Sequence, residues 1–373
     1  MAKKEEYTKK ELRQHIYDTP DTYAGGSDLI TETLPIFLED GSISFKEIEY
    51  IPVLYNIFNE ILVNARDQII RLEGVKDAAQ VSHIKVTYDT ETGEWSILND
   101  GQGISIEKHS SENIYNPELI FGRLLTSSNY DKDEKKIVGG KNGYGAKLTN
   151  IFSTFFKVET VDHINELKYT QEFHNNMTVI DKPEIKKCSK KPYTKITWKT
   201  DLKRFNLENF SDNMISLMIR RVYDIAGITE NKLNVSYNDE KLIIKSFQDY
   251  LKLYETVSNK IYEHISERWE ISACSSSSDK FEQLSFVNGI ATPKGGIHVD
   301  IIVKQITSGV VDYIKKTKKK NIPEKYVKNY LSVYINSVIE NPSFDSQTKE
   351  RLITPKSKFG SKPEISQKFI KKL

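Results

Sequence analysis

The feature that most constrains this chain is a cluster of four glycines in the seven positions from 139 to 145. It lies in the stretch VGGKNGYGAKLTNIFS, residues 138–153, which continues as an amphipathic segment. Glycine is costly to order, so a cluster of it favours a backbone that must approach another group closely. The free N–H groups and the dipole at a helix N-terminus attract anions. The stretch therefore predicts a phosphate-binding loop at the start of a helix, with a flexible surface loop as the alternative.

The loop differs from the two common phosphate-binding patterns. In the P-loop a lysine follows the second glycine and a serine or threonine follows the lysine, whereas Ala146 separates Gly145 from Lys147 here. The dinucleotide pattern G-x-G-x-x-G lacks its third glycine, because Leu148 occupies that position. The sequence therefore requires a phosphate loop of another kind.

A long helix is predicted for residues 52–73, where apolar residues recur at helical spacing. Its opposite face carries Glu60, Asn64, Asp67 and Arg71 at steps of four, three and four residues, which places them in one stripe. Asparagine is a poor residue for a helix interior, and its side-chain oxygen suits an Mg²⁺ ion that also binds substrate phosphates. Glu60, one turn earlier, is placed to orient a water for attack on a phosphoryl group. A solvated helix face is the alternative for both residues.

A third feature is NDGQGI, residues 99–104, which closes a predicted hairpin of residues 84–89 and 94–100. An aspartate followed by two glycines at a strand end is often only a turn. The carboxylate of Asp100 can also accept a hydrogen bond from the exocyclic amine of adenine while the backbone closes over the base. The helix with Glu60 and Asn64, this strand end and the glycine-rich loop occur in that order, and coincidence is a poor explanation for all three.

The rest of the chain predicts further strands and helices around these motifs. A short helix is expected at residues 117–125, a longer helix at residues 213–228, and a second α/β unit from about Val235, which includes a helix at residues 299–314. Strands are expected at residues 155–162, 167–173, 194–200 and 283–292, with another hairpin at residues 231–244.

Charge is balanced overall but uneven along the chain. Lys and Arg number 54 against 52 Asp and Glu, a net charge of +2, so no global field attracts nucleic acid. A local field is predicted by the five lysines in the six positions 315–320, for which a solvated surface is the alternative. These are Lys315, Lys316, Lys318, Lys319 and Lys320.

Cysteine usage and the first residues bear on the compartment. Cys188 and Cys274 have no metal-ligand spacing and no partner pattern, which indicates a reducing compartment. The first residues, MAKKEEYTKKEL, are charged and contain no apolar run. We therefore expect an intracellular, soluble protein without a signal peptide or a membrane span.

With these motifs in order, the sequence resembles the ATPase superfamily shared by gyrase, the heat-shock chaperones, sensor histidine kinases and mismatch-repair ATPases. Within it the chain looks like eukaryotic-type DNA topoisomerase II. The similar segments are PDTYAGGSD (20–28), IFNEILVNARDQ (57–68), LLTSSNYDKDEKKIVGGKNGYGAKLTNIFST (124–154), SFVNGIATPKGGIHVDIIVKQI (285–306) and ENPSFDSQTKERL (340–352).

The resemblance implies an α+β fold with two domains. Residues 1–236 would form an N-terminal strap and a GHKL-type ATPase α/β sandwich, the Bergerat fold. Residues 237–373 would form a transducer domain of the ribosomal S5-like α/β fold, which carries the QTK loop. The motif SQTKE, residues 346–350, favours the topoisomerase and gyrase branch, because there a lysine from the second domain reaches the nucleotide.

The resemblance also implies residue roles. Glu60 would be the general base and Asn64 the Mg²⁺ ligand, while Gln347 and Lys349 would reach the γ-phosphate, with Lys349 counted as catalytic. Tyr7, in the strap, would contact nucleotide bound to the partner subunit. The full ATP-binding set is Tyr7, Asn64, Asp67, Asp100, Ser127, Ser128, Asn129, Lys141, Asn142, Gly143, Tyr144, Gly145, Ala146, Lys147, Gln347 and Lys349.

Two positions depart from the family pattern, and some assignments have a plain structural alternative. Thr19 stands before Pro20 where the family usually has arginine, and Gln68 replaces a usual asparagine. The resemblance therefore does not predict the local contacts of these two residues. Ser127 and Ser128 have helix capping as an alternative, and Lys349 a solvated helix start.

At the level of the whole protein, the resemblance implies ATP and Mg²⁺ as cofactors, a homodimer that ATP closes, and double-stranded DNA as partner, captured at the N-gate during strand passage. The lysines at 315–320 would then touch DNA in the transducer. Location would be the nucleus, or the host cell for a viral protein. We expect this region to hydrolyse ATP but not to cleave DNA, because the family's cleavage machinery lies downstream. Alternatives are a chaperone or mismatch-repair clamp and an ATP-gated, non-catalytic DNA clamp.

Overall fold

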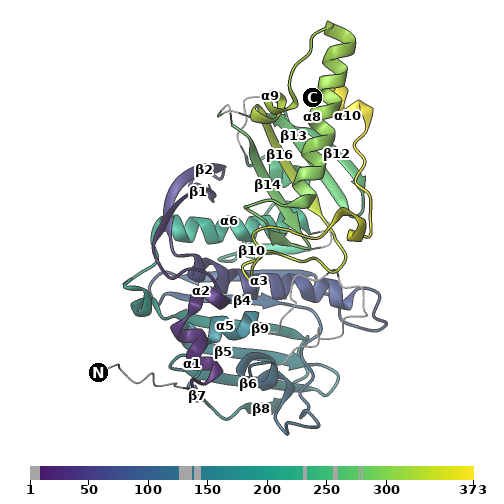
Figure 1. The fold of residues 1–373 in the computed structure, drawn as a ribbon. Helices are drawn as coiled ribbons and strands as arrows, with labels where there is room; N and C mark the ends of the chain where they lie inside the picture. The colour runs from purple at the N-terminus through teal and green to yellow at the C-terminus, as the bar shows by residue number, and fades with distance from the viewer. Residues whose placement is uncertain are drawn as a thin grey trace, which may run out of the picture.

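The computed structural model describes residues 9–125, 137, 144–229, 233–254, 259–276, 278 and 280–373. Within these residues the chain forms three sheets of two, nine and five strands, with helices packed against the two larger ones (Figure 1). The expected mixture of α and β structure is confirmed.

The nine-stranded sheet runs in the order β11-β10-β3-β4-β9-β5-β6-β7, with β8 also paired to β6. Its strands are β3 (His83–Asp89), β4 (Glu94–Asn99), β5 (Ser153–Asp162), β6 (Leu167–His174), β7 (Val179–Ile180), β8 (Glu184–Lys187), β9 (Tyr193–Thr200), β10 (Asn234–Tyr237) and β11 (Glu240–Lys241). The helices of this part are α1 (Leu12–Asp18), α2 (Pro20–Tyr23), α3 (Pro52–Leu72), α4 (Asn116–Gly122), α5 (Gly145–Ile151), α6 (Asp212–Ile228) and α7 (Phe247–Leu251), with a 3₁₀ turn at Leu202–Phe205. A separate hairpin of β1 (Ile30–Phe37) and β2 (Ile43–Tyr50) packs against α6.

Helix α3 is the element that the sequence predicted best. Pro52 occupies its first turn, where a missing N–H costs nothing. Its apolar face is buried, and the Phe58 ring lies 4.7 Å from that of Trp95 on β4. This packing leaves the face with Glu60 and Asn64 only partly buried. The predicted helix at residues 52–73 is therefore confirmed.

The five-stranded sheet has the order β12-β13-β16-β14-β15. Its strands are β12 (Ile261–Ser266), β13 (Trp269–Ser275), β14 (Glu282–Val287), β15 (Ile290–Ala291) and β16 (Leu331–Ser337). Its helices are α8 (Ile297–Lys318), α9 (Glu324–Asn329) and α10 (Gln367–Lys372), with a 3₁₀ turn at Lys356–Lys358. Helix α8 runs along this sheet, and its C-terminal end projects beyond the strands (Figure 1).

Two expectations for this part differ from the structure. The single strand expected at residues 283–292 is a hairpin, because Asn288 and Gly289 both adopt positive φ, 51° and 79°, and turn β14 into β15. The helix expected at residues 299–314 extends from Ile297 to Lys318.

The division of the chain follows the sheets. Strand β10 pairs in parallel with β3, from Asn234 opposite His83 to Tyr237 opposite Val86, so it belongs to the nine-stranded sheet. The boundary expected between residues 236 and 237 falls inside this strand and stays a prediction. The first strand of the smaller sheet is β12, which begins at Ile261.

Candidate active site

The start of α5 lies directly against the polar face of α3. A Cβ atom on Gly145 would lie 2.0 Å from Oε2 of Glu60, so a side chain at this position would displace the carboxylate from its observed place. The Thr149 hydroxyl donates a hydrogen bond to the Ile57 carbonyl at 2.8 Å, which ties α5 to α3. The glycine that begins α5 is therefore explained by close approach. The preceding residues 138–143 lie outside the described residues.

Lys349 reaches the same carboxylate from the other side. Its Nζ donates a hydrogen bond to Oε1 of Glu60 at 3.0 Å, across 289 positions of sequence. Glu60, Gln347 and Lys349 line one small cavity, together with apolar side chains that include Leu148 and Ile290. The structure thus brings together the proposed base, the QTK loop and the start of α5.

The backbone of the QTK loop is held in place by its neighbours. Lys349 is only 8% exposed and has φ of 61°, a left-handed conformation that is uncommon for a residue with a side chain. On the far side of this residue, the N–H of Lys294 donates to the Glu350 carbonyl at 3.1 Å, and the two side chains form an ion pair at 2.6 Å. No motif or spacing in the sequence predicts that Lys294 supports this loop.

Lys147 lies on α5 and is 2% exposed. Burial disfavours the charged form, and it lowers the pKa of the Lys147 ammonium from about 10.5 to about 8. Tyr144 next to the helix start is partly buried, and Ala146 is buried. A buried cation of this kind is suited to an anionic ligand, because a negative charge would restore the protonated form.

The four residues of the stripe predicted on α3 differ in how far they are buried. Glu60 and Asn64 are partly exposed, one turn apart on one face. Asp67 is fully buried, with its Oδ1 3.7 Å from Nη1 of Arg66, whereas Arg71 is exposed. Of the four residues in this stripe, Asp67 alone is enclosed, and Glu60 and Asn64 are the partly exposed pair beside the start of α5.

Asp100 has a structural role at the ends of two strands. One carboxylate oxygen accepts hydrogen bonds from the N–H groups of Ser82 and His83, both at 2.7 Å, and the other accepts from the Ser82 hydroxyl at 2.5 Å. These bonds tie the start of β3 to the end of β4. A Cβ on Gly103 would lie 2.0 Å from the Val161 carbonyl oxygen, so this glycine also permits close approach. Contact of Asp100 with adenine stays a prediction.

The two departures from the family pattern make local contacts. The Thr19 hydroxyl donates to the His15 carbonyl at 2.5 Å where α1 ends. The Gln68 amide donates to the Gln102 carbonyl at 3.3 Å and so links α3 to the loop after Asp100.

Seven predicted site residues lie outside the described residues, and their roles stay predictions: Tyr7, Ser127, Ser128, Asn129, Lys141, Asn142 and Gly143.

The five lysines at 315–320 lie at the end of α8 that projects from the molecule (Figure 1). All five are exposed, and Lys315, Lys316 and Lys319 line an open hollow with Asp312 and Asn321. Lysines in a last helical turn also complement the helix dipole. Their exposure fits either a solvated end or contact with a polyanion.

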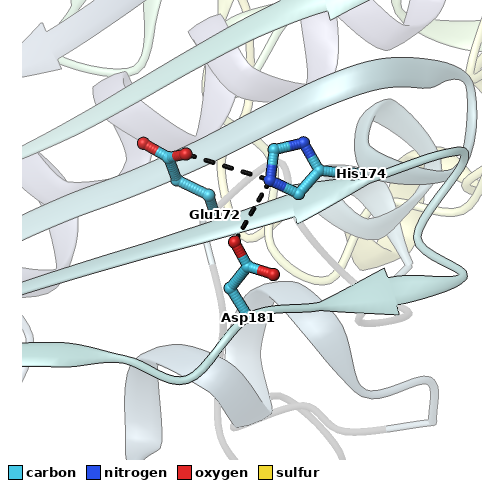
Figure 2. A group of neighbouring side chains, drawn as sticks. All are labelled: Glu172, His174 and Asp181. Carbon is cyan, nitrogen blue, oxygen red and sulfur yellow. Dashed lines mark hydrogen bonds and ion pairs between the residues drawn. The ribbon is translucent and has the colours of Figure 1, made fainter.

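One cluster of possible metal ligands was not predicted from the sequence. The Nε2 of His174 lies 3.2 Å from a carboxylate oxygen of Asp181 and 3.8 Å from one of Glu172; dashed lines mark these two interactions in Figure 2. Glu172 also pairs with Lys157 at 3.2 Å. Hydrogen bonds and ion pairs among these residues on β5, β6 and the segment after β7 account for the arrangement.

Among the described residues, no helix is both long and apolar enough to span a lipid bilayer.

Comparisons with known proteins agree over nearly the whole chain. A family model described as DNA gyrase B matches residues 233–373. Curated relatives include DNA topoisomerase 2 of Arabidopsis thaliana, 46% identical over 99% of this chain, and human DNA topoisomerase 2-alpha, 44% identical over 98% of it. The chain spans 25% and 24% of the length of these two relatives, respectively.

Solved structures give the same likeness in three dimensions. The ATPase region of Saccharomyces cerevisiae topoisomerase II, bound to ICRF-187 (dexrazoxane), has a TM-score of 0.92 at 42% identity and covers 98% of this chain and 95% of that one. The ATPase and transducer domains of DNA topoisomerase II from Balamuthia mandrillaris give a TM-score of 0.91 at 42% identity, with 98% and 93% coverage.

The buried ammonium of Lys147 predicts a pH-dependent stability. Between pH 8 and 10.5 the folded protein has released this proton while the unfolded chain still holds it, so the free energy of unfolding rises with pH. Relative to Lys147→Met, the parent should gain on the order of 3 kcal/mol across this window. Urea unfolding from pH 7 to 10.5 measures the difference, with Lys182→Met, an exposed site, as control. Parallel profiles for the parent and Lys147→Met would contradict the prediction.

Proposed function

This chain belongs to the DNA topoisomerase II family, and from that premise we propose that it is the ATP-binding and ATP-hydrolysing N-gate region of a type IIA DNA topoisomerase. The expected GHKL-type ATPase fold followed by a transducer is confirmed by the likeness to solved ATPase and transducer regions. The chaperone and mismatch-repair alternatives are thereby set aside. The observation that supports hydrolysis most directly is the contact of Lys349 with Glu60 in one cavity.

The proposed reaction uses residues from both sheets. Glu60 accepts a proton from the attacking water, and the Lys349 ammonium stabilises the negative charge that develops on the γ-phosphate. Residues 142–147 surround the triphosphate, and Gln347 binds the γ-phosphate beside Lys349. Asp100 binds the adenine edge through acceptor capacity that its bonds to Ser82 and His83 leave open.

Mg²⁺ fits the residues that are present. Asn64 offers a neutral amide oxygen on a partly exposed turn next to Glu60, and one such oxygen with waters and phosphates is a common Mg²⁺ environment. When bound, the ion would neutralise charge on the phosphates. Asp67 is enclosed beside Arg66, so we assign it a supporting role beneath the nucleotide rather than direct contact with the ion.

The activity of the complete protein is proposed on the same basis. ATP would close a homodimer, with Tyr7 of each strap reaching the nucleotide of the other subunit, and the closed gate would capture a DNA duplex for strand passage. The transducer would begin between β11 and β12, where the chain leaves the nine-stranded sheet. We also propose that the protein acts in the nucleus, or in the host cell if it is viral.

Loss of the base should stop hydrolysis without stopping binding. Glu60→Gln keeps the side-chain shape but cannot accept the proton, so we expect phosphate release to fall by roughly 10²-fold or more, with nucleotide affinity nearly unchanged. Steady-state phosphate release and nucleotide titration measure the two effects. Glu73→Gln, at an exposed position just after α3, is the matched control. Hydrolysis at the parent rate in Glu60→Gln would show that the general-base assignment is wrong, whereas no hydrolysis in the parent would favour a non-catalytic clamp.

Binding of ATP should hold two chains together as a dimer. A strap that completes the neighbour's site requires pairing, so a non-hydrolysable ATP analogue should shift the protein from monomer to dimer at micromolar concentration. Sedimentation velocity with and without the analogue measures this shift. A strictly monomeric protein in the presence of the analogue would count against the proposal.

The exposed lysines at the end of α8 should couple DNA to hydrolysis. Contacts of lysine with phosphate are independent of base sequence and release counterions, so changing all five to glutamine should lower the ratio of ATPase rates with and without DNA. The measurement is made at low salt and repeated at rising salt, where the parent's stimulation should weaken steeply. The control changes five other exposed lysines to glutamine: Lys182, Lys186, Lys187, Lys190 and Lys191. Equal stimulation by DNA in parent and variant would mean that the five lysines form only a solvated helix end.

A further inference from the structure

A fully buried arginine on α6 contacts both sides of the proposed active site. The Nε of Arg221 donates to the side-chain oxygen of Asn59 at 2.7 Å, and Asn59 directly precedes Glu60 on α3. Its Nη2 donates to the backbone carbonyl of Gly289 in the turn between β14 and β15. Its Nη1 lies 3.3 Å from a carboxylate oxygen of Asp224. One planar guanidinium therefore bridges the helix of the base and a turn of the five-stranded sheet.

The turn that Arg221 binds continues toward Lys349. The side chain of Asn288 accepts a hydrogen bond from the N–H of Ile339 and donates one to its carbonyl, both at 2.8 Å. Ile339 follows β16 and begins the segment that carries Lys349. On the other side of the turn, Ile290 lines the cavity of Glu60 and Lys349, as Asn59 does. Movement of this turn relative to α3 would change the separation of the two catalytic groups.

The neighbouring Arg220 provides an internal comparison. It is also buried, on the same helix, and its Nη1 lies 2.9 Å from the same Asp224. Its Nη2 donates to the hydroxyl of Tyr55 on α3 at 3.2 Å. Both of these contacts of Arg220 thus lie within the part of the chain that packs on the nine-stranded sheet. Arg221 differs from it in reaching the second sheet.

We propose that Arg221 is a positioning residue that fixes the distance between Glu60 and Lys349 by bridging Asn59 and the Gly289 turn. The inference rests on the proposed function, because it concerns the rate of ATP hydrolysis. Arginine suits this role since its donors lie in a rigid plane, whereas a lysine ammonium is a compact point charge that cannot match two separated acceptors in the same way. Misplacement of reacting groups by about 1 Å can cost roughly 10²-fold in rate.

The experiment compares Arg221→Lys with Arg220→Lys in the full chain. We expect Arg221→Lys to lower kcat for ATP by roughly 10- to 100-fold while KM changes by less than about threefold, because bound substrate is held but the catalytic groups are misplaced. Arg220→Lys should keep kcat within about threefold. Equal kcat values for the two variants, or an effect confined to KM, would overturn the inference.

A double-mutant cycle shows whether Arg221 acts through Lys349. Lys349→Met removes the ammonium, so adding Arg221→Lys should slow the enzyme little further. Independent, multiplying effects would contradict the proposal. Should Arg221→Lys fail to fold, Asn59→Ala removes the same bridge from the α3 side, and its kcat loss must likewise vanish in the Lys349→Met background.

The two proposals fail in different ways. If the parent does not hydrolyse ATP, the proposed function is wrong, and if Glu60→Gln hydrolyses it normally, the role of Glu60 as base is wrong. If the parent hydrolyses ATP and both Glu60→Gln and Lys349→Met impair it, but Arg221→Lys matches Arg220→Lys, only the positioning role is wrong.

Discussion

The largely buried ion pair between Glu60 and Lys349 is the contact that relates the two large sheets around the cavity. Apolar packing also joins them, since Phe286 and Tyr334 of the five-stranded sheet belong to the same core cluster as Trp95 of the nine-stranded sheet. Hydrophobic burial is non-directional, however, and tolerates small shifts. Hydrogen bonds and ion pairs between specific atoms do not tolerate such shifts. These directional contacts therefore set the alignment of the catalytic groups.

These directional contacts carry an electrostatic cost. Charges removed from water need partners, and loss of one partner leaves an uncompensated charge. Glu60 is bounded by the Lys349 ammonium on one side and by Gly145 at the start of α5 on the other. Lys147 is enclosed nearby on α5, with its pKa lowered by burial. A polyanionic ligand would favour the charged form of this buried lysine, which favours a triphosphate over a neutral ligand.

Local sequence pattern predicted the elements but not their meeting points. The spacing of apolar residues was sufficient for α3, and strand alternation for β3 and β4, because these signals lie within single elements. The contact of Glu60 with Lys349 spans 289 positions, and no periodicity predicts it. The family resemblance assigned both residues to the reacting phosphate but did not predict their direct contact. The Asn-Gly pair at 288–289 carried a hairpin signal that was read as continuous strand. The bridge by Arg221 was missed because a helical arginine normally indicates a solvated face.

Burial and the ion pair with Glu60, together with a positive φ, distinguish Lys349 from an ordinary surface charge. A positive φ of 61° favours glycine or asparagine, and a residue with a longer side chain adopts it at a cost of order 1 kcal/mol or more. Glycine would remove this strain but also the ammonium. Positive φ alone does not mark a functional lysine, since the exposed Lys319 at the end of α8 also has φ of 56°. The strain is understandable when the ammonium must reach one carboxylate from a loop that Lys294 and Glu350 hold in place.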